Sequence, residues 1–400
     1  MEANRADLGP RVLDDVRVLD FTGIIAGSYC TRMMADLGAD VLKIEPPGGE
    51  LMRQIAPLRG EASTVFAALN SGKRCMVLDL KQPSAVDICK LLVTRYDVVV
   101  ENFSPGVMAR LGLDYAALQA ENPALIMCSV SGYGQTGPGA ARPAFAPIVQ
   151  ALSGFDLVTL ANQPGLTRPF NMGLPVGDTT ASQQAFGAIV AALYYRARTG
   201  IGQYIDIAMQ DSLVATMHRD FQSAFLEDHI DRIYGPIETR DGFIIAMPLS
   251  QSQFTALIAC IDRTDLADDL RFNTMRERLD HYNELMAITE AWSRQRTTRE
   301  AVHALEAAHI PCAPYRDIIA MSEDPQLHHR GMLTEIVDEA GPLRVPNTPF
   351  LFSATQAAVR PTVARIGEHT HSVLIDELDL SADDIAALVA GGVINAAARA

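Results

Sequence analysis

One carboxylate, Asp178, stands where an extended, proline-containing segment meets a long apolar helix, in GLPVGDTTASQQAFGAIVAAL. Two roles suit an aspartate at the start of a helix. Aspartate is a preferred N-cap residue, because its side-chain oxygen accepts a backbone N–H of the first turn. Alternatively, the carboxylate is a covalent nucleophile, and the helix N-terminus favours its ionised form. The small neighbours Gly177 and Thr179 leave room for an acyl group, and the residue types leave both roles open.

A second candidate site is the stretch at residues 18–47, which reads VLDFTGIIAGSYCTRMMADLGADVLKIEPP. Its pattern predicts a strand, a glycine-bearing turn, a helix and a second strand, which is the outline of a dinucleotide-binding unit. The turn TGIIAG lacks the G-x-G-x-x-G spacing that lets a pyrophosphate approach a helix N-terminus. Glu45 stands about where a ribose-binding acid would lie, but two prolines follow it directly. The spacing therefore argues against NAD, and the framework needs another ligand.

Strands alternate with helices through the first half of the chain. The hydrophobic pattern predicts strands at residues 16–21, 40–45, 75–80, 97–103 and 124–134, with helices at 28–38 and 84–96 between them. This alternation predicts an α/β fold with a mostly parallel sheet covered on both faces. A Gly- and Pro-rich loop, a helix that ends at Gly200, and a further strand and helix follow at residues 135–147, 179–200 and 203–221.

Composition sets the broad class of the protein. With 400 residues, 48% of them hydrophobic and 20% charged, the chain is long enough for two globular domains. The net charge of −15 argues against nucleic acid or an anionic membrane as a partner. Six cysteines without a CxxC pair, and a polar, acidic N-terminal segment, predict a cytoplasmic protein with reduced thiols and no membrane span.

Motifs spread in order over nearly the whole chain carry a resemblance to a known family. They are LDFTGIIAG, LGADVLKIEPPGG, LNSGKRCMVLDLK, VVENFSPGVMARLGLDY, SVSGYGQTGP, LPVGDTTAS, TGIGQYIDIAMQDS, HIPCAPYRD, DPQLHHRGM and GEHTHSVLIDELDLS. The chain resembles the family III CoA-transferases, the CaiB/BaiF family. This superfamily contains formyl-CoA transferases and also α-methylacyl-CoA racemases, so the resemblance alone leaves the reaction open.

The resemblance implies a particular architecture. It implies a Rossmann-like large domain formed by both chain ends, a small inserted and mostly helical domain, and two interlocked, ring-shaped subunits in a homodimer. A change in composition near residue 215 and a return to short β elements after residue 331 fit this arrangement. We therefore expect residues 1–215 to form the CoA-binding N-terminal part of the large domain, 216–330 the small domain, and 331–400 the return to the large domain.

The resemblance also implies the chemistry. Asp178 falls on the position of the catalytic aspartate of the family, with CoA or an acyl-CoA as cosubstrate, a free carboxylic acid as the other substrate, and neither a metal nor a tightly bound cofactor. The residues implied in CoA binding are Ala26, Leu78, Asp79, Leu80, Lys81, Asn102, Phe103 and Arg110. Taken singly, Lys81 reads better as a surface lysine and Asn102 as a strand-end turn, and only the ordered set of motifs favours CoA binding. Lys73 and Arg74 form a further small basic spot.

Three alternatives stay open on the residues. A racemase needs two acid–base groups on opposite faces of the α-carbon, but no histidine precedes His218 in this chain, which favours the transferase. A non-catalytic CoA-binding protein is the third class, against which the retained Asp178 argues. Ala146 and Ile25 depart from the oxalate-specific branch, so oxalate is not the expected acceptor. Arg168 and Arg219 are candidates to pair with the second carboxylate of a short dicarboxylic acid.

Overall fold

The computed structural model describes residues 9–163, 165–226 and 234–395, and its contacts divide the chain into two compact units. The first unit takes the described residues of Met1–Ser153, Gly173–Thr216 and Pro325–Ala400. The second unit takes those of Gly154–Met172 and Met217–Asp324. Residues 154–172, which the sequence analysis assigned to the large domain, therefore group with the second unit. The first eight residues of the polar N-terminal segment lie outside the described residues.

A six-stranded sheet forms the centre of the first unit. Its order is β5-β2-β1-β6-β7-β8, and every neighbouring pair is parallel. The strands are β1 (Arg17–Asp20), β2 (Asp40–Glu45), β5 (Arg74–Val77), β6 (Val98–Glu101), β7 (Ile126–Ser131) and β8 (Tyr204–Ala208). This is the strand order of doubly wound nucleotide-binding folds, in which ligands lie beyond the carboxyl ends of the strands. The predicted parallel α/β sheet is confirmed.

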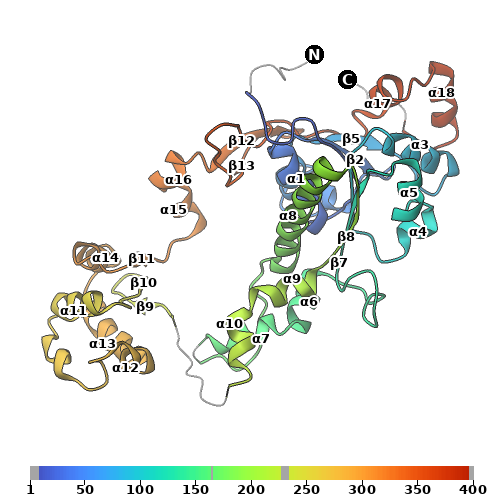
Figure 1. Ribbon diagram of the computed structural model, residues 1–400. Coiled ribbons are helices and arrows are strands. Elements are labelled where there is room, and N and C mark those ends of the chain that lie inside the picture. Colours follow the sequence, from blue (N-terminus) through green and yellow to red (C-terminus); the bar gives the residue numbers. More distant parts are fainter. Residues whose placement is uncertain (1–8, 164, 227–233, 396–400) are drawn as a thin grey trace. The chain divides into compact units, whose positions relative to one another are not determined.

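Helices cover both faces of this sheet, because each connection between parallel strands must cross over one face. Figure 1 shows α1 and α8 on one side and α3, α4 and α5 on the other. The helices of this unit are α1 (Ala26–Asp36), α2 (Thr64–Asn70), α3 (Pro83–Val93), α4 (Val107–Leu111), α5 (Tyr115–Glu121), α6 (Ala146–Leu152), α8 (Val176–Thr199), α9 (Met209–Thr216), α16 (Pro325–His329), α17 (Thr370–Asp376) and α18 (Ala382–Ala390). The predicted helix end at Gly200 is confirmed, because Gly200 takes the left-handed conformation there.

The main core lies between the sheet and the α3 face. Leu19 lies opposite Leu42 on one side and Val99 on the other, so these side chains share a face, and Met127 extends the row. They pack in one cluster with buried residues from α3 and α5 and, from the C-terminal part of the chain, from α17 and α18. The C-terminal segment also bonds the edge of the sheet, where Asp79 N–H donates to Val393 O at 2.9 Å. Both ends of the chain thus build one core.

Smaller elements complete the two units. In the first unit, β3 (Leu58–Arg59) pairs with β4 (Ala62–Ser63) and β12 (Leu333–Asp338) pairs with β13 (Gly341–Pro346), while a short 3-10 helix spans Leu51–Gln54. The second unit has a three-stranded antiparallel sheet of β9 (Ile237–Glu238), β10 (Phe243–Ala246) and β11 (Cys312–Pro314). Its helices are α7 (Phe155–Ala161), α10 (His218–Ser223), α11 (Gln251–Cys260), α12 (Met275–Asp280), α13 (Tyr282–Ser293), α14 (Thr298–Ala307) and α15 (Ile318–Ser322), with a 3-10 helix at Thr264–Asp268.

The described residues contain no helix long and apolar enough to cross a membrane. They also contain no group of three or more His, Cys, Asp or Glu side chains arranged to hold a metal ion.

Candidate active site

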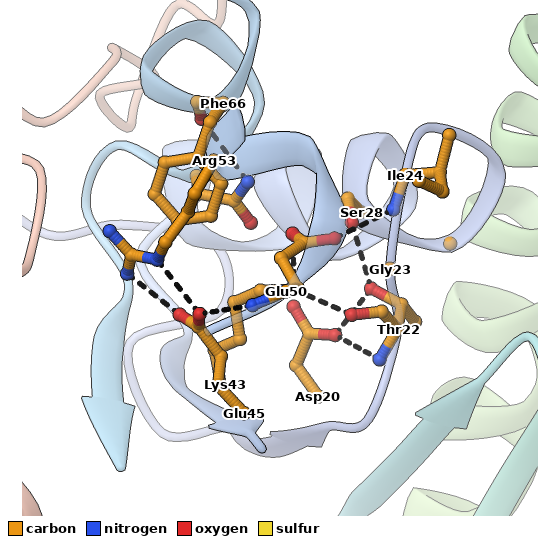
Figure 2. A network of polar contacts seen from close by, with 12 residues as sticks. Asp20, Thr22, Gly23, Ile24, Ser28, Lys43, Glu45, Glu50, Arg53 and Phe66 are labelled. Carbon is orange, nitrogen blue, oxygen red and sulfur yellow. Dashed lines mark hydrogen bonds and ion pairs between the residues drawn. The ribbon is translucent and has the colours of Figure 1, made fainter. Parts of the chain in front are cut away.

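The turn between β1 and α1 uses its backbone donors internally. Thr22 N–H donates to Asp20 Oδ1, Gly23 N–H to Asn102 Oδ1 and Ile24 N–H to Glu50 Oε2, each at 2.8 Å. Figure 2 shows Asp20 and Glu50 reaching this turn. In a dinucleotide-binding fold, backbone N–H groups of this turn face a pyrophosphate. Here the fold itself uses these N–H groups, so they are not free for a pyrophosphate, and this adds a physical reason to the argument against NAD.

Glu50 also supports an unusual backbone conformation. Ile24 has a φ of 61°, in the left-handed region that is unfavourable for a β-branched residue. Glu50 stabilises this conformation, because it accepts the Ile24 N–H. Glu50 is itself held by an ion pair with Lys43 Nζ at 3.1 Å. Glu50 is 7% exposed, so this support is buried. Sequence reasoning did not identify Glu50, because nothing in its local context indicates a partner 26 residues earlier.

Buried charges lie directly under the turn. Asp20, fully buried at the end of β1, forms an ion pair with Lys73 Nζ at 2.9 Å. Lys43 Nζ donates to Thr22 O at 2.6 Å. Burial alone would raise the pKa of Asp20, but the charges of Lys43 and Lys73 outweigh it and lower that pKa to about 2. Asp20 is therefore ionised at neutral pH and anchors the turn through both the charges and Thr22.

Lys73 and Arg74 do not form a free basic spot. Lys73 was read as part of a basic spot, but it is buried and its amine also donates to Ser28 O and Asn70 Oδ1 at 2.9 and 2.8 Å. Its neighbour Arg74 pairs with Asp40 and Glu377 at 2.8 and 2.7 Å. Both are used inside the fold, which leaves neither as a free phosphate contact.

Glu45, at the position of a ribose-binding acid, also has an internal role. Its two oxygens accept bonds from Arg53 at 2.8 and 2.7 Å, and it accepts the Glu50 N–H at 2.9 Å. The Arg53 guanidinium lies 3.8 Å from the centroid of the Phe66 ring, and Figure 2 shows Arg53 between Glu45 and Phe66. Glu45 therefore fixes the loop that carries Glu50 and is not available to a ribose.

Asp178 lies in the first turn of α8 but does not cap it. The helix begins at Val176 with Pro175 at the N-cap, so Asp178 is the third helical residue. The N-cap interpretation of Asp178 is therefore wrong. Its carboxylate makes no hydrogen bond or ion pair with any residue that the structure describes. Asp178 is partly buried, and burial raises the pKa of this carboxyl to about 6.

The cap of α8 comes from a neighbouring helix. Gln150, fully buried in α6, accepts the Val176 N–H through Oε1 at 3.1 Å. Its Nε2 has no partner among the described residues. A buried amide donor without a partner is costly, so this N–H₂ group is available to an acceptor near the start of α8. Sequence reasoning missed Gln150, since a cap supplied from another helix has no local spacing.

Ser182 joins the first turns of α1 and α8. Its fully buried hydroxyl lies 2.5 Å from Ala26 O and 2.7 Å from Asp178 O, and its single hydrogen can serve either carbonyl. A Cβ at Gly27 would lie 2.3 Å from the Thr22 side chain, so only glycine permits this close approach of α1 to the turn. The structure thus brings Ala26, predicted to contact CoA, next to the turn that carries Asp178.

The other residues predicted to contact CoA follow the carboxyl ends of strands. Leu78, Asp79, Leu80 and Lys81 come directly after β5, while Asn102 and Phe103 follow β6 and Arg110 lies on α4. Lys81 and Arg110 are exposed. The Leu78 side chain is in the core and its N–H donates to Glu45 O at 2.9 Å, so neither of these groups is free for a ligand. The Asn102 amide is engaged by Gly23, since Asn102 Nδ2 also donates to Gly23 O at 2.8 Å. Arg168 and Arg219 lie in the second unit, and their role stays a prediction.

Comparison with known proteins supports one family. Residues 13–370 match the CoA-transferase family III. The chain is 34% identical to the succinyl-CoA–D-citramalate CoA-transferase of Chloroflexus aurantiacus, over 96% of this chain and 98% of that protein. It is 33% identical to the succinate–glutarate CoA-transferase of Agrobacterium fabrum, over 91% and 95% of the two chains.

Solved structures agree with these relatives. The crystal structure of Rv3272 from Mycobacterium tuberculosis is similar with a TM-score of 0.80 and 30% identity, covering 90% of this chain and 98% of that chain. A CaiB/BaiF family protein from Brucella suis gives a TM-score of 0.79 and 29% identity, with 92% and 99% covered. The resemblance inferred from the sequence motifs is confirmed, and this chain belongs to the CoA-transferase family III.

Proposed function

We propose that this enzyme moves CoA from an acyl-CoA thioester to a free short dicarboxylic acid, with Asp178 as the covalent nucleophile. The observation that carries the proposal is the Asp178 carboxylate itself, which is partly buried and has no partner among the described residues. A carboxylate that serves the fold is normally hydrogen-bonded or paired. Its link through Ser182 to Ala26 supports a reacting group next to the CoA-binding edge.

The chemistry conserves the thioester bond energy. An Asp178 oxygen attacks the donor thioester carbonyl, the C–S bond breaks, and CoA leaves as a thiolate. A mixed anhydride between Asp178 and the donor acid remains. The thiolate then attacks the aspartyl carbonyl, which releases the donor acid as a carboxylate and leaves an aspartyl-CoA thioester. The acceptor carboxylate attacks this thioester to form a second anhydride, and the returning thiolate forms the new acyl-CoA. Each step exchanges one acyl bond, so no net proton is gained or lost.

The dicarboxylic acid is proposed from the named relatives, which act on citramalate and glutarate with succinyl-CoA or succinate. We expect the enzyme to convert succinyl-CoA and a C4 or C5 dicarboxylate into succinate and the new thioester. Mass spectrometry of the thioesters formed with a panel of acids measures this. Absence of any new thioester would contradict the proposed function. Deuterium uptake at the α-carbon in heavy water without CoA exchange would instead establish the racemase alternative.

By resemblance we also propose an interlocked homodimer, which a molar-mass measurement in solution tests.

The rate of the first step is expected to depend on pH through Asp178. Only the ionised carboxylate attacks, and burial raises its pKa from 3.8 to about 6. Because the pKa is raised, lowering the pH through this value removes the nucleophile, so the rate falls about tenfold for each pH unit below about 6 and is flat above about 7. Single-turnover acylation, with circular dichroism to confirm folding at each pH, measures this. A rate that stays constant down to about pH 4.5 would contradict the raised pKa.

A further inference from the structure

A cavity of about 330 Å³ lies within the first unit beside the turn that carries Asp178. Pro175 and Thr179, on either side of Asp178 in the chain, line it and are joined because Thr179 donates from N–H and from Oγ1 to Pro175 O, both at 3.0 Å. Ile25, the residue before Ala26, lines it as well. The cavity therefore lies beside the first turn of α8, which carries the proposed nucleophile, and beside the start of α1. Its volume is that of a small-ligand site.

Most of the cavity wall is hydrocarbon. Met33 of α1 and Val65 and Leu69 of α2 supply side chains to it, and Pro346 and Pro349, at and after the end of β13, close it from the C-terminal part of the chain. Such a wall suits the methylene groups of an acyl chain. It does not suit a nucleotide or a phosphate, which need several polar partners.

One part of the lining is charged. Arg32 and Asp36, 3% and 4% exposed, both line the cavity. Arg32 Nε donates to Asp36 Oδ1 at 2.7 Å, and its NH1 contacts Ala68 O. Arg32 is the only lysine or arginine among the residues that line this cavity in the described chain. A buried guanidinium at an apolar cavity is a recognition group for a carboxylate.

More than one positive charge acts on Asp36. Besides Arg32, the charges of Arg11 and of Lys73, which itself pairs with Asp20, reach this carboxylate. Thr348, 5% exposed, also lines the cavity with a hydroxyl that has no partner in the described chain. The Arg32 guanidinium and the Thr348 hydroxyl are thus among the donors that this lining offers to a ligand carboxylate.

We propose that this cavity holds the acyl chain of a dicarboxylic acid, with the distal carboxylate at Arg32 and Thr348 and the reacting carbonyl at Asp178. The inference rests on the proposed function and assigns its specificity to residues of α1. It is an alternative to recognition by Arg168 or Arg219, which both lie in the second unit, and the experiment separates the three arginines. Because Arg32 is already paired with Asp36, we expect discrimination well below the 10⁴–10⁵-fold of a site with an unpaired partner, about 10²-fold.

Competition between two acceptors tests the inference. Glutarate and valerate, which have the same chain length, are mixed with succinyl-CoA, and the ratio of glutaryl-CoA to valeryl-CoA is measured. This ratio depends only on the two acceptors, because the donor step and the amount of active enzyme cancel. The wild type is expected to favour glutarate by about 10²-fold. The variant Arg32→Gln/Asp36→Asn, which removes one charge of each sign, is expected to lower the preference to within about threefold, while Arg168→Gln and Arg219→Gln leave it unchanged.

The outcomes are distinguishable. A preference that survives in Arg32→Gln/Asp36→Asn, or a wild type without preference for the diacid, overturns the inference and leaves the transferase intact. Loss of the preference in Arg168→Gln or Arg219→Gln also overturns it and moves recognition to the second unit. If the double variant yields no thioester at all, Arg32→Lys decides, because it keeps the charge but not the planar fork. A lower preference there supports the inference, and an unchanged one overturns it. No product from the wild type with either acid contradicts the proposed function instead.

Discussion

Replacement of Asp178 by Asn is expected to slow CoA transfer at least about 10⁴-fold at neutral pH, because the covalent route loses its nucleophile. An amide of the same shape cannot form the anhydride or the aspartyl-CoA thioester. Incubation with an acyl-CoA should therefore add the mass of CoA less one water to the wild-type chain and nothing to the variant. Intact-protein mass spectrometry and the steady-state rate measure the two effects. A variant that keeps even a tenth of the wild-type rate would contradict nucleophilic catalysis by Asp178.

The fold of the same variant provides the control. The pKa of Asp178 is raised in the folded protein, so its ionisation opposes folding above the unfolded value of about 3.9. Asp178→Asn should thus melt at or above the wild-type temperature at neutral pH, and this difference should disappear as the pH falls below about 4. The matched control is Asp211→Asn, an exposed aspartate in the first turn of α9. It should leave the rate unchanged.

The sheet and its helices could be predicted from the sequence, because their signals are local. The strand at residues 40–45 was predicted with the bounds that β2 has, since the apolar Val41, Leu42 and Ile44 stand between a helix-terminating glycine and two prolines. The strand predicted at residues 75–80 ends earlier, at Val77. Leu78 continues the apolar run, but its side chain packs in the core below the sheet edge and its N–H still bonds Glu45 O. Hydrophobicity shows burial there, whereas the end of pairing depends on the neighbouring strand.

The site itself could be predicted only in part. Asp178 was placed at the start of a helix, but its position in that helix depends on Pro175 and on Gln150 from α6. Lys73 was read as part of a basic spot because its partner Asp20 lies 53 residues away in the chain. Glu50, Gln150 and Arg32 were missed for the same reason, since each acts on a group that is close only after folding. The spacing of residues in the sequence indicates helices and strands, but it does not indicate hydrogen bonds and ion pairs between residues of separate elements.

Replacement of Asp20 by Asn is expected to destabilise the protein by about 3–5 kcal/mol, the range found when one partner of a buried ion pair is removed. Asp20 is fully buried and accepts from Thr22 N–H at 2.8 Å, from Thr31 Oγ1 at 2.7 Å and from Lys73 Nζ at 2.9 Å. Asn keeps the shape but leaves the buried Lys73 without its counter-charge. Urea unfolding of the wild type and the variant measures the loss, and a difference under about 1 kcal/mol would contradict it.

A double variant and the pH dependence show that the loss comes from charge. Changing Lys73→Met together with Asp20→Asn removes one charge of each sign, so the double variant should be more stable than the sum of the single losses by about 2 kcal/mol or more. The pKa of Asp20 is depressed from 3.8 to about 2, so its stabilising effect is complete above about pH 5 and fades as the pH falls toward 2. The gap between wild type and Asp20→Asn should follow that course. Asp20 anchors Thr22 at the start of the turn that leads to Ala26, which Ser182 joins to the turn of Asp178. Any Asp20→Asn protein that remains folded should therefore also acylate Asp178 more slowly. A folded variant with the wild-type acylation rate would show that the turn does not position the nucleophile.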